Sequence, residues 1–159
     1  MEFHNIPAIY NENSEILILG SFPSQKSREA QFFYGHPQNR FWSVLSRILG
    51  EDLPQSTKEK REMLLKNKIA LWDVIESCEI IGSSDSSIKN VIPNDIGSIL
   101  EKSKIKRIFV NGKTAEKYYN KYIFPRLKIS ATTLPSTSPA NAAYSLERLV
   151  DEWKVILEK

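Results

Sequence analysis

The residues best suited to chemistry lie between positions 16 and 42. A short apolar run over 16–19 ends at Gly20, a pattern typical of a strand buried on both faces. A turn and an aromatic-rich loop follow, and polar side chains stand among the rings: Ser21, His36, Gln38 and Asn39. Flat rings beside amides suit a planar heterocycle, and open α/β sheets bind ligands at the carboxyl ends of their strands. The alternative is a plain βα unit whose aromatic residues only form core.

Polar residues follow three further predicted strands in the same way. Asp73 ends the second strand, the turn 111–114 (Asn-Gly-Lys-Thr) follows the third, and the loop 134–142 follows the fourth. The turn opens a helix, so its free amides and Lys113 can hold an anion. Because all these segments follow strand ends, they are expected to converge on one edge of the sheet and form one site.

Apolar periodicity and turn residues divide the chain into alternating strands and helices. Strands are expected over 16–20, 68–75, 105–110 and 127–132, and helices beginning near Asn39, Ser56, Pro93, Lys113 and Asn141. The Ser- and Gly-rich segment 76–94 is expected to be a long functional loop. In the last helix, Trp153 is expected in the core. This pattern predicts the α/β class, a three-layer αβα arrangement around a central four-stranded, largely parallel sheet, in a single domain spanning 1–159.

Composition restricts the class of protein. A single cysteine, Cys78, excludes an internal disulfide and a cysteine-rich metal or iron–sulfur site, and two His residues are too few for a histidine metal site. We therefore expect no metal and no cofactor. No apolar run reaches the roughly 18 residues of a membrane span, and the first residues lack a signal pattern. The expectation is a cytoplasmic protein without membrane attachment.

Positive charge is concentrated in one segment. The net charge is only +3, but residues 101–128 carry nine Lys or Arg against two Glu. A basic stripe of this kind can follow a phosphate backbone. The alternative is an ordinary solvated helix face.

Five short motifs, in order along the chain, resemble the uracil-DNA glycosylase superfamily. They are GSFPS at 20–24, FFYGHPQNRFW at 32–42, LWDV at 71–74, VNGK at 110–113 and LPSTSPANA at 134–142. Within this superfamily the pattern is most similar to the hypoxanthine-DNA glycosylase branch, and the mismatch-specific branch shares the HPxNRFW segment. The resemblance implies that the chain has the glycosylase fold and acts on DNA as a monomer.

The resemblance also implies roles for individual residues. Many members carry Asp or Asn two residues after the first glycine to position a water, and this chain has Phe22 there, which suits the hypoxanthine branch. In that branch an asparagine on the next helix positions the water instead, and the matching residue is Asn39. An amide is not a base, so Asn39 would hold and orient the water. The alternative for Asn39 is an ordinary helix N-cap.

A base-binding pocket is implied next to this position. Tyr34 matches the aromatic residue that stacks the flipped base in the mismatch-specific branch, and Asp73 matches the residue that reads the base edge by accepting an N–H. The alternatives are core packing for Tyr34 and Phe22 and the capping of a turn for Asp73. The remaining members of the expected pocket are Gly20, Ser21 and Phe22.

DNA contacts are expected from the last motif and from Lys113. Ser136 stands where the uracil enzymes usually have a histidine, which lowers the expectation of strong uracil activity. Hydroxyls and amides of Ser136, Thr137, Ser138 and Asn141 suit phosphate contacts. His36 either compensates for the missing histidine or is a structural hydrogen bonder.

The sequence thus predicts a monofunctional DNA glycosylase that flips out and hydrolyses a deaminated base, chiefly hypoxanthine, leaving an abasic site. One alternative is a uracil or mismatched-thymine glycosylase of the same superfamily. A second alternative is a non-catalytic nucleic-acid-binding domain on the same scaffold.

Overall fold

A four-stranded parallel sheet forms the centre of the computed structural model, which describes residues 1–158 and leaves Lys159 of the expected domain outside the described residues. Its strands lie in the order β3 (Ile69–Asp73), β2 (Ile16–Gly20), β6 (Arg107–Asn111) and β7 (Ala131–Leu134). All three neighbouring pairs are parallel. The predicted four-stranded parallel α/β sheet is therefore confirmed.

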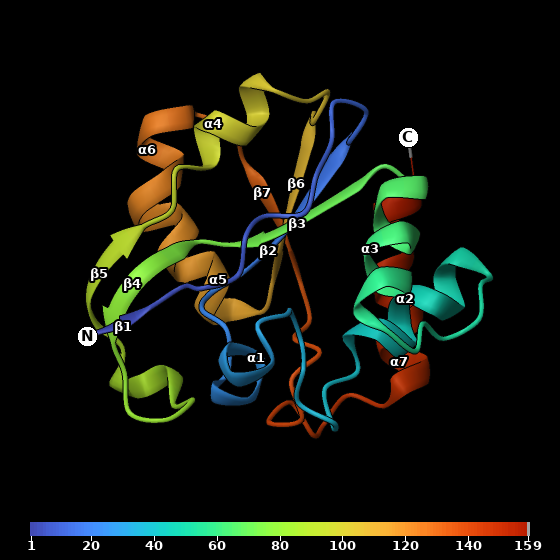
Figure 1. The fold of residues 1–159 in the computed structure, drawn as a ribbon, viewed down its shortest axis with the longest axis horizontal. Coiled ribbons are helices and arrows are strands. Elements are labelled where there is room, and N and C mark those ends of the chain that lie inside the picture. The colour runs from blue at the N-terminus through green and yellow to red at the C-terminus, as the bar shows by residue number, and fades with distance from the viewer. Residues whose placement is uncertain (159) are drawn as a thin grey trace.

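Helices cover both faces of this sheet (Figure 1). On one side lie α2 (Phe41–Leu49), α3 (Thr57–Lys66) and α7 (Leu146–Trp153). On the other side lie α4 (Ile96–Glu101), α5 (Lys113–Tyr118) and α6 (Phe124–Leu127), with a π-helical turn over Tyr119–Ile123 between the last two. Within residues 1–158, no helix has the length and apolar character needed to cross a membrane.

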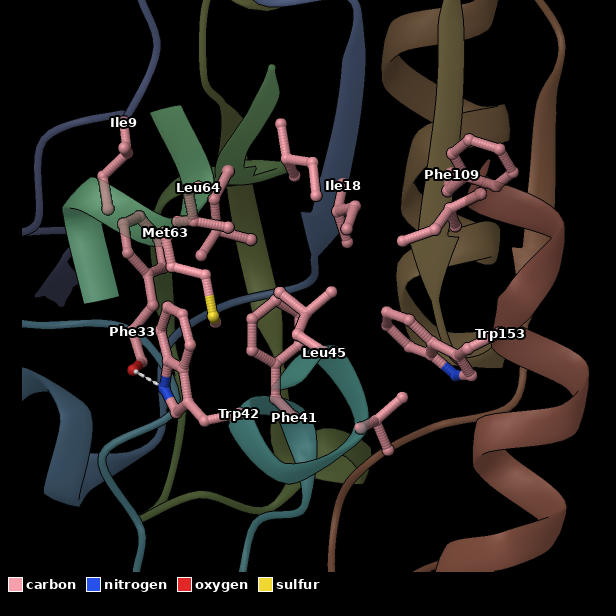
Figure 2. Close-up of a cluster of buried hydrophobic side chains, with 14 of the residues drawn as sticks. Ile9, Ile18, Phe33, Phe41, Trp42, Leu45, Met63, Leu64, Phe109 and Trp153 are labelled. Atoms are coloured by element: carbon pink, nitrogen blue, oxygen red, sulfur yellow. Dashed lines mark hydrogen bonds between the residues drawn. The ribbon is translucent and has the colours of Figure 1, made fainter. Parts of the chain in front are cut away.

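Side chains alternate between two cores because successive residues of a strand point to opposite faces. In β2, Ile18 belongs to the core under α2, α3 and α7, whereas Leu17 and Leu19 belong to the core on the other face. Figure 2 shows the first core, where Trp42 donates its indole N–H to the carbonyl of Phe33 at 3.2 Å. Trp153 has no exposed surface, which confirms its predicted place in the core.

The predicted loop 76–94 is wrong at both ends, because these form the two strands of a β-hairpin. Strands β4 (Ile75–Glu79) and β5 (Lys89–Pro93) pair antiparallel, and β1 (Glu2–Phe3) adds to β4 to complete a second sheet. The predicted strand 68–75 therefore ends at Asp73, and the chain passes directly into the hairpin. The polar composition of 76–94 hid these strands, because Ser, Glu, Lys and Asn stand at many of their positions. The connection 80–88 between them is irregular apart from a short 3₁₀ turn at Asp85–Ser87.

Several predicted boundaries also need correction. The fourth strand covers Ala131–Leu134 instead of 127–132, because α6 extends to Leu127 and Lys128 ends it in a left-handed conformation. Helix α4 begins at Ile96 with Asp95 as its cap, since Pro93 still belongs to β5. A helix that was not predicted, α1 (Gln25–Ala30), lies in the aromatic-rich loop and is capped by Ser24.

Asn141 is not the cap of the last helix. Ser145 holds that position in α7 and accepts the backbone N–H of Arg148. By contrast, the predicted start of α3 near Ser56 is confirmed, because Ser56 is its N-cap and accepts the backbone N–H of Glu59 at 3.1 Å.

Candidate active site

A cavity of about 890 Å³ opens where the loops after β2, β3, β6 and β7 meet. These loops gather beside α1 at the lower edge of the molecule in Figure 1. All eleven predicted site residues line the cavity: Gly20, Ser21, Phe22, Tyr34, Asn39, Asp73, Lys113, Ser136, Thr137, Ser138 and Asn141. The parallel sheet brings them together as expected, while their individual roles stay predictions.

Gly20 lies close to two side-chain oxygen atoms, one from Asp73 and one from Tyr34. A Cβ atom on this residue would lie 2.4 Å from Oδ1 of Asp73 and 3.1 Å from the hydroxyl of Tyr34. The pairing of β2 with β3 places Gly20 directly beside Asp73, at the carboxyl ends of both strands. A residue without a side chain is therefore required here, and it leaves a carboxylate and a phenol side by side in the cavity.

Three features of the structure fix the position of Tyr34. Its backbone is left-handed, with a φ of 52°, and its ring stacks on Phe41 with centroids 4.1 Å apart. Asn111 donates its side-chain N–H to the Tyr34 hydroxyl at 3.2 Å. Burial, and then the nearby Asp73, raise the pKa of Tyr34 well above its usual range. The phenol therefore stays neutral, and its own proton remains available for donation.

Asn39 is the end of a short chain of hydrogen bonds. Asn111 donates to the Thr137 hydroxyl at 3.0 Å, and this hydroxyl donates to Oδ1 of Asn39 at 2.9 Å. The same Oδ1 accepts the backbone N–H of Phe41, the first residue of α2, at 2.9 Å, while Arg40 holds the N-cap position itself. With both lone pairs of this oxygen in use, the group that Asn39 can offer to the cavity is its NH₂, a donor.

The loop after β7 is fastened to the start of α2 by Arg40. The guanidinium donates to the carbonyl groups of Ser138 at 3.1 Å, Asn141 at 3.0 Å and Tyr144. The backbone N–H of Arg40 also donates to the carbonyl of Thr137. Two motifs about a hundred residues apart are thereby joined into one wall of the cavity.

Gly112 packs closely against Ser136 at the turn between β6 and α5. Gly112 has a φ of 96°, and a Cβ on it would lie 3.0 Å from the side chain of Ser136. This glycine lets β6 turn into α5 against the loop after β7. The exposed Lys113 then begins α5 at the cavity mouth.

Phe22 and His36 have different surroundings. Phe22 lines the cavity, and the guanidinium of Arg28 lies 5.3 Å from the centre of its ring. His36 accepts the backbone N–H of Gln38 at 3.1 Å, in agreement with the structural alternative for this residue. Within residues 1–158, no group of three or more His, Cys, Asp and Glu side chains gathers in a way that could hold a metal.

Comparison with known proteins places this arrangement in a family. The model of the uracil DNA glycosylase superfamily matches residues 7–158. The chain belongs to this superfamily. A hypoxanthine DNA glycosylase of Methanosarcina acetivorans is 38% identical over 152 residues, which cover 94% of each chain. A hypoxanthine DNA glycosylase of Methanosarcina barkeri is 38% identical over 120 residues, covering 74% of this chain and 76% of the relative.

A solved structure supports the same assignment. The solution NMR structure of a Methanosarcina acetivorans protein superposes with a TM-score of 0.81 at 36% identity, covering 95% of this chain and 93% of that one. The superfamily resemblance seen in the five motifs is thus confirmed.

Three residues of this superfamily site were not predicted individually. Asn111 ends β6 beside the cavity, and the rule that sites follow strand ends would have identified it. Arg40 lies inside the HPQNRFW motif, but its partners are not visible in the sequence. His4, whose ring nitrogen lies 2.8 Å from Asp73, has no local signal at all.

Proposed function

We propose that this chain is a monofunctional DNA glycosylase that removes hypoxanthine from deoxyinosine and leaves an abasic site. The two relatives that bear the name hypoxanthine DNA glycosylase support this substrate. The enzyme is proposed to consist of one domain and to act on DNA as a monomer. It is also proposed to be cytoplasmic.

The observation that carries this proposal is the pair of oxygen atoms above Gly20. Oδ1 of Asp73 is an acceptor, and the neutral hydroxyl of Tyr34 is a donor. Hypoxanthine presents the matching pair on neighbouring atoms, with N1–H as donor and O6 as acceptor. Adenine in the same pose turns the lone pair of N1 toward the carboxylate, which repels it. The pocket therefore suits the deaminated purine better than its parent base.

Base flipping adds to this selectivity. Hypoxanthine formed from adenine lies opposite thymine as a mismatch, so it costs less to extrude than a paired base. The flipped base is proposed to rest against the ring of Phe22, because a base whose O6 accepts the Tyr34 hydroxyl at its edge cannot also lie on the face of the Tyr34 ring. Stacking of Tyr34 on Phe41 holds the phenol in place for this donation.

Asn39 is proposed to hold the water that attacks the sugar. Its NH₂ donates to the water oxygen, so a remaining lone pair of that oxygen can point at C1′. The C1′–N9 bond breaks first, its electrons leave with the purine, and the oxocarbenium-like sugar takes up the water. The proton of the water passes to solvent, and the purine anion regains one from solvent. Asn39 therefore needs no basicity for this step.

Lys113 and the loop 136–141 are proposed to bind the DNA backbone next to the flipped nucleotide. Lys113 starts α5 at the cavity mouth, and the loop offers hydroxyl groups and backbone amides there. These contacts would fix the position of the sugar relative to Asn39.

Uracil is the second candidate, because its N3–H and neighbouring carbonyl present the same donor and acceptor to Asp73 and Tyr34. A cavity that accepts the larger purine does not exclude the smaller pyrimidine. The loss of stacking area and the absence of a histidine at position 136 are the reasons to rank it second.

Excision assays with matched variants test the proposal. Oligonucleotides carrying hypoxanthine, uracil, xanthine or mismatched thymine are incubated with excess enzyme, and abasic sites are cleaved with alkali. We expect cleavage chiefly at hypoxanthine, slowed about hundredfold in Asn39→Ala. Asn39→Ser keeps an oxygen that can accept the backbone N–H of Phe41 but lacks the amide, so it should be equally slow with a thermal stability closer to wild type.

Two other outcomes of these assays would contradict the proposal. Cleavage chiefly at uracil would establish the second candidate. Binding of DNA without cleavage of any substrate would show a non-catalytic binding domain.

A further inference from the structure

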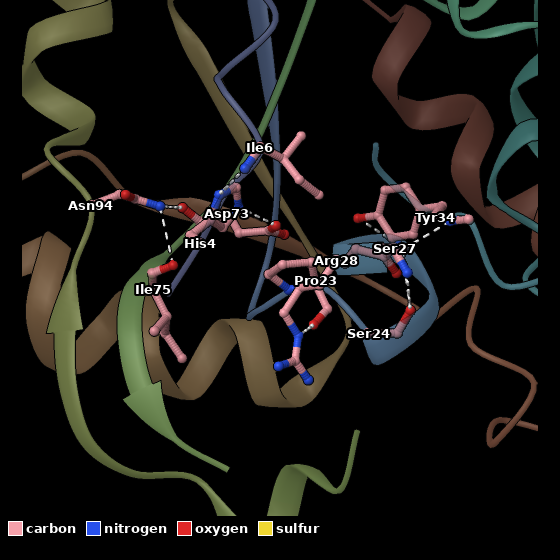
Figure 3. A network of polar contacts seen from close by, with 12 residues as sticks. His4, Ile6, Pro23, Ser24, Ser27, Arg28, Tyr34, Asp73, Ile75 and Asn94 are labelled. Atoms are coloured by element: carbon pink, nitrogen blue, oxygen red, sulfur yellow. Dashed lines mark hydrogen bonds and ion pairs between the residues drawn. The ribbon is translucent and has the colours of Figure 1, made fainter. Parts of the chain in front are cut away.

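The carboxylate of Asp73 is held by His4, which directly follows strand β1 near the N-terminus. Nε2 of His4 lies 2.8 Å from Oδ2 of Asp73, and the two side chains are only 2% and 5% exposed. Among residues 1–158, His4 is the one side chain that hydrogen-bonds this carboxylate. Figure 3 shows the two groups meeting beside the cavity residue Tyr34. A carboxylate this buried depends on its partner for its orientation.

The second hydrogen bond of His4 decides which ring nitrogen carries the proton. Nδ1 accepts the backbone N–H of Ile6 at 3.3 Å, and a nitrogen that accepts carries no proton. The proton of the imidazole therefore lies on Nε2 and is donated to Asp73. As a neutral donor, His4 orients the carboxylate without cancelling its negative charge.

The imidazole has little freedom to move. Rings of Phe22, Phe33 and Trp72 surround it, with centroids 6.2, 5.9 and 6.3 Å away. The backbone N–H of His4 donates to the carbonyl of Glu76, next to the pairing of β1 with β4. His4 is thus fixed by the second sheet while it remains outside the lining of the cavity.

Such support matters because the terminal torsion of an aspartate is soft. Rotation about χ2 has a broad, roughly twofold profile, so the side chain alone does not fix either oxygen. The bond from His4 holds Oδ2, which leaves Oδ1 directed at the point above Gly20 beside the Tyr34 hydroxyl. Without His4, Oδ1 of Asp73 would no longer keep a fixed position relative to the Tyr34 hydroxyl.

We propose that His4 is a positioning residue for base recognition, which holds Asp73 so that Oδ1 accepts the N1–H of the flipped hypoxanthine. This inference rests on the proposed function. It gives the N-terminal segment that carries His4 a role in substrate selection.

Two substitutions separate the two hydrogen bonds of His4. His4→Gln places an amide N–H near the position of Nε2, within reach of Asp73. His4→Asn places an amide oxygen near the position of Nδ1, so it keeps an acceptor for Ile6 but does not reach Asp73. We expect the single-turnover excision rate of hypoxanthine to fall about tenfold to hundredfold in His4→Asn and to stay within about threefold of wild type in His4→Gln.

A double-mutant cycle tests whether His4 acts through Asp73. If it does, His4→Asn should cause no further loss of rate in an Asp73→Ala background. A residue that affects the reaction independently of Asp73 would slow both backgrounds equally, and one that only stabilises the fold would slow neither under the conditions used. All rates are measured with saturating enzyme, at a temperature where thermal unfolding curves show every variant folded.

The outcomes separate the inference from the function on which it rests. Equal slowing in both backgrounds, a wild-type rate in His4→Asn, or a loss in His4→Gln as large as in His4→Asn would each overturn the role of His4 while wild-type excision of hypoxanthine still stands. Failure of the wild-type protein to excise hypoxanthine would overturn the proposed function, and this inference with it.

Discussion

At the level of single residues, the tightest constraint in the site falls on Gly20. Most glycines are selected for backbone freedom, but this one leaves space for its neighbours. A methyl group there would occupy the place of Oδ1 of Asp73 and press on the hydroxyl of Tyr34. Since His4 holds the other oxygen of Asp73, the carboxylate has little room to retreat.

Gly20→Ala should therefore remove base recognition while the sheet survives. We expect the single-turnover excision rate of hypoxanthine to fall by about hundredfold, because the acceptor is displaced by about an ångström. Gly97→Ala is a suitable control, because the nearest atom to its new Cβ, Cδ2 of Leu127, would lie at an ordinary 3.4 Å. A Gly20→Ala enzyme with the wild-type rate would contradict the proposed reading of the base edge.

At the level of elements, the site depends on the joining of α2 to the loop after β7. Helix α2 contributes Asn39 at its start, and the loop contributes Thr137, whose hydroxyl donates to Asn39. Arg40 holds the two together by donating to three carbonyl groups of the loop. The catalytic asparagine of the proposal is thus oriented by contacts that neither element makes alone.

Arg40→Met should loosen this loop. The substitution keeps an aliphatic stem but leaves three carbonyls without their donor, and we expect a loss of about 1–3 kcal/mol in the free energy of unfolding. Hydrogen exchange of the amides in 138–144 should accelerate, and excision should slow with it. Arg47→Met is the control, since the Arg47 side chain forms an exposed ion pair with Glu147 at 3.5 Å, and its effect should stay within about 0.5 kcal/mol. Unchanged exchange in the Arg40 variant would show that the loop is held by other contacts.

At the level of the whole molecule, a parallel sheet with four strand ends at one edge produces a cavity rimmed by several loops. The basic segment 101–128 includes Lys113 at this rim. Because DNA carries condensed counterions, each phosphate contact made by a lysine adds to the salt dependence of binding.

Lys113→Ala should weaken DNA binding to a similar degree for all sequences. We expect the slope of log K against log salt to decrease in magnitude by about one. Fluorescence anisotropy at several salt concentrations measures this slope. Lys58→Ala is the control, because Lys58 lies exposed on α3, apart from the cavity-lining residues, and forms an exposed ion pair with Glu62. An equal change of slope in both variants would argue against a specific contact at Lys113.

The sequence by itself determined the central sheet and the membership of the site. Continuous apolar runs such as 16–19 are local signals of buried parallel strands, and polar residues directly after them must meet at one edge. For this reason Ser21, Asp73 and Lys113 could be assigned to one cavity without any knowledge of tertiary contacts. Asn39 was assigned through the resemblance of its motif to the superfamily.

Only the tertiary structure decided how those residues are held. His4 and Asp73 are 69 positions apart, Arg40 contacts carbonyls about a hundred residues away, and β4 finds one partner strand at the N-terminus. Such pairings leave no periodicity in the sequence, because each depends on elements that become neighbours only after the sheet has formed. The orientation of Asp73, and with it the proposed choice of base, therefore follows from packing between distant segments and not from any local pattern.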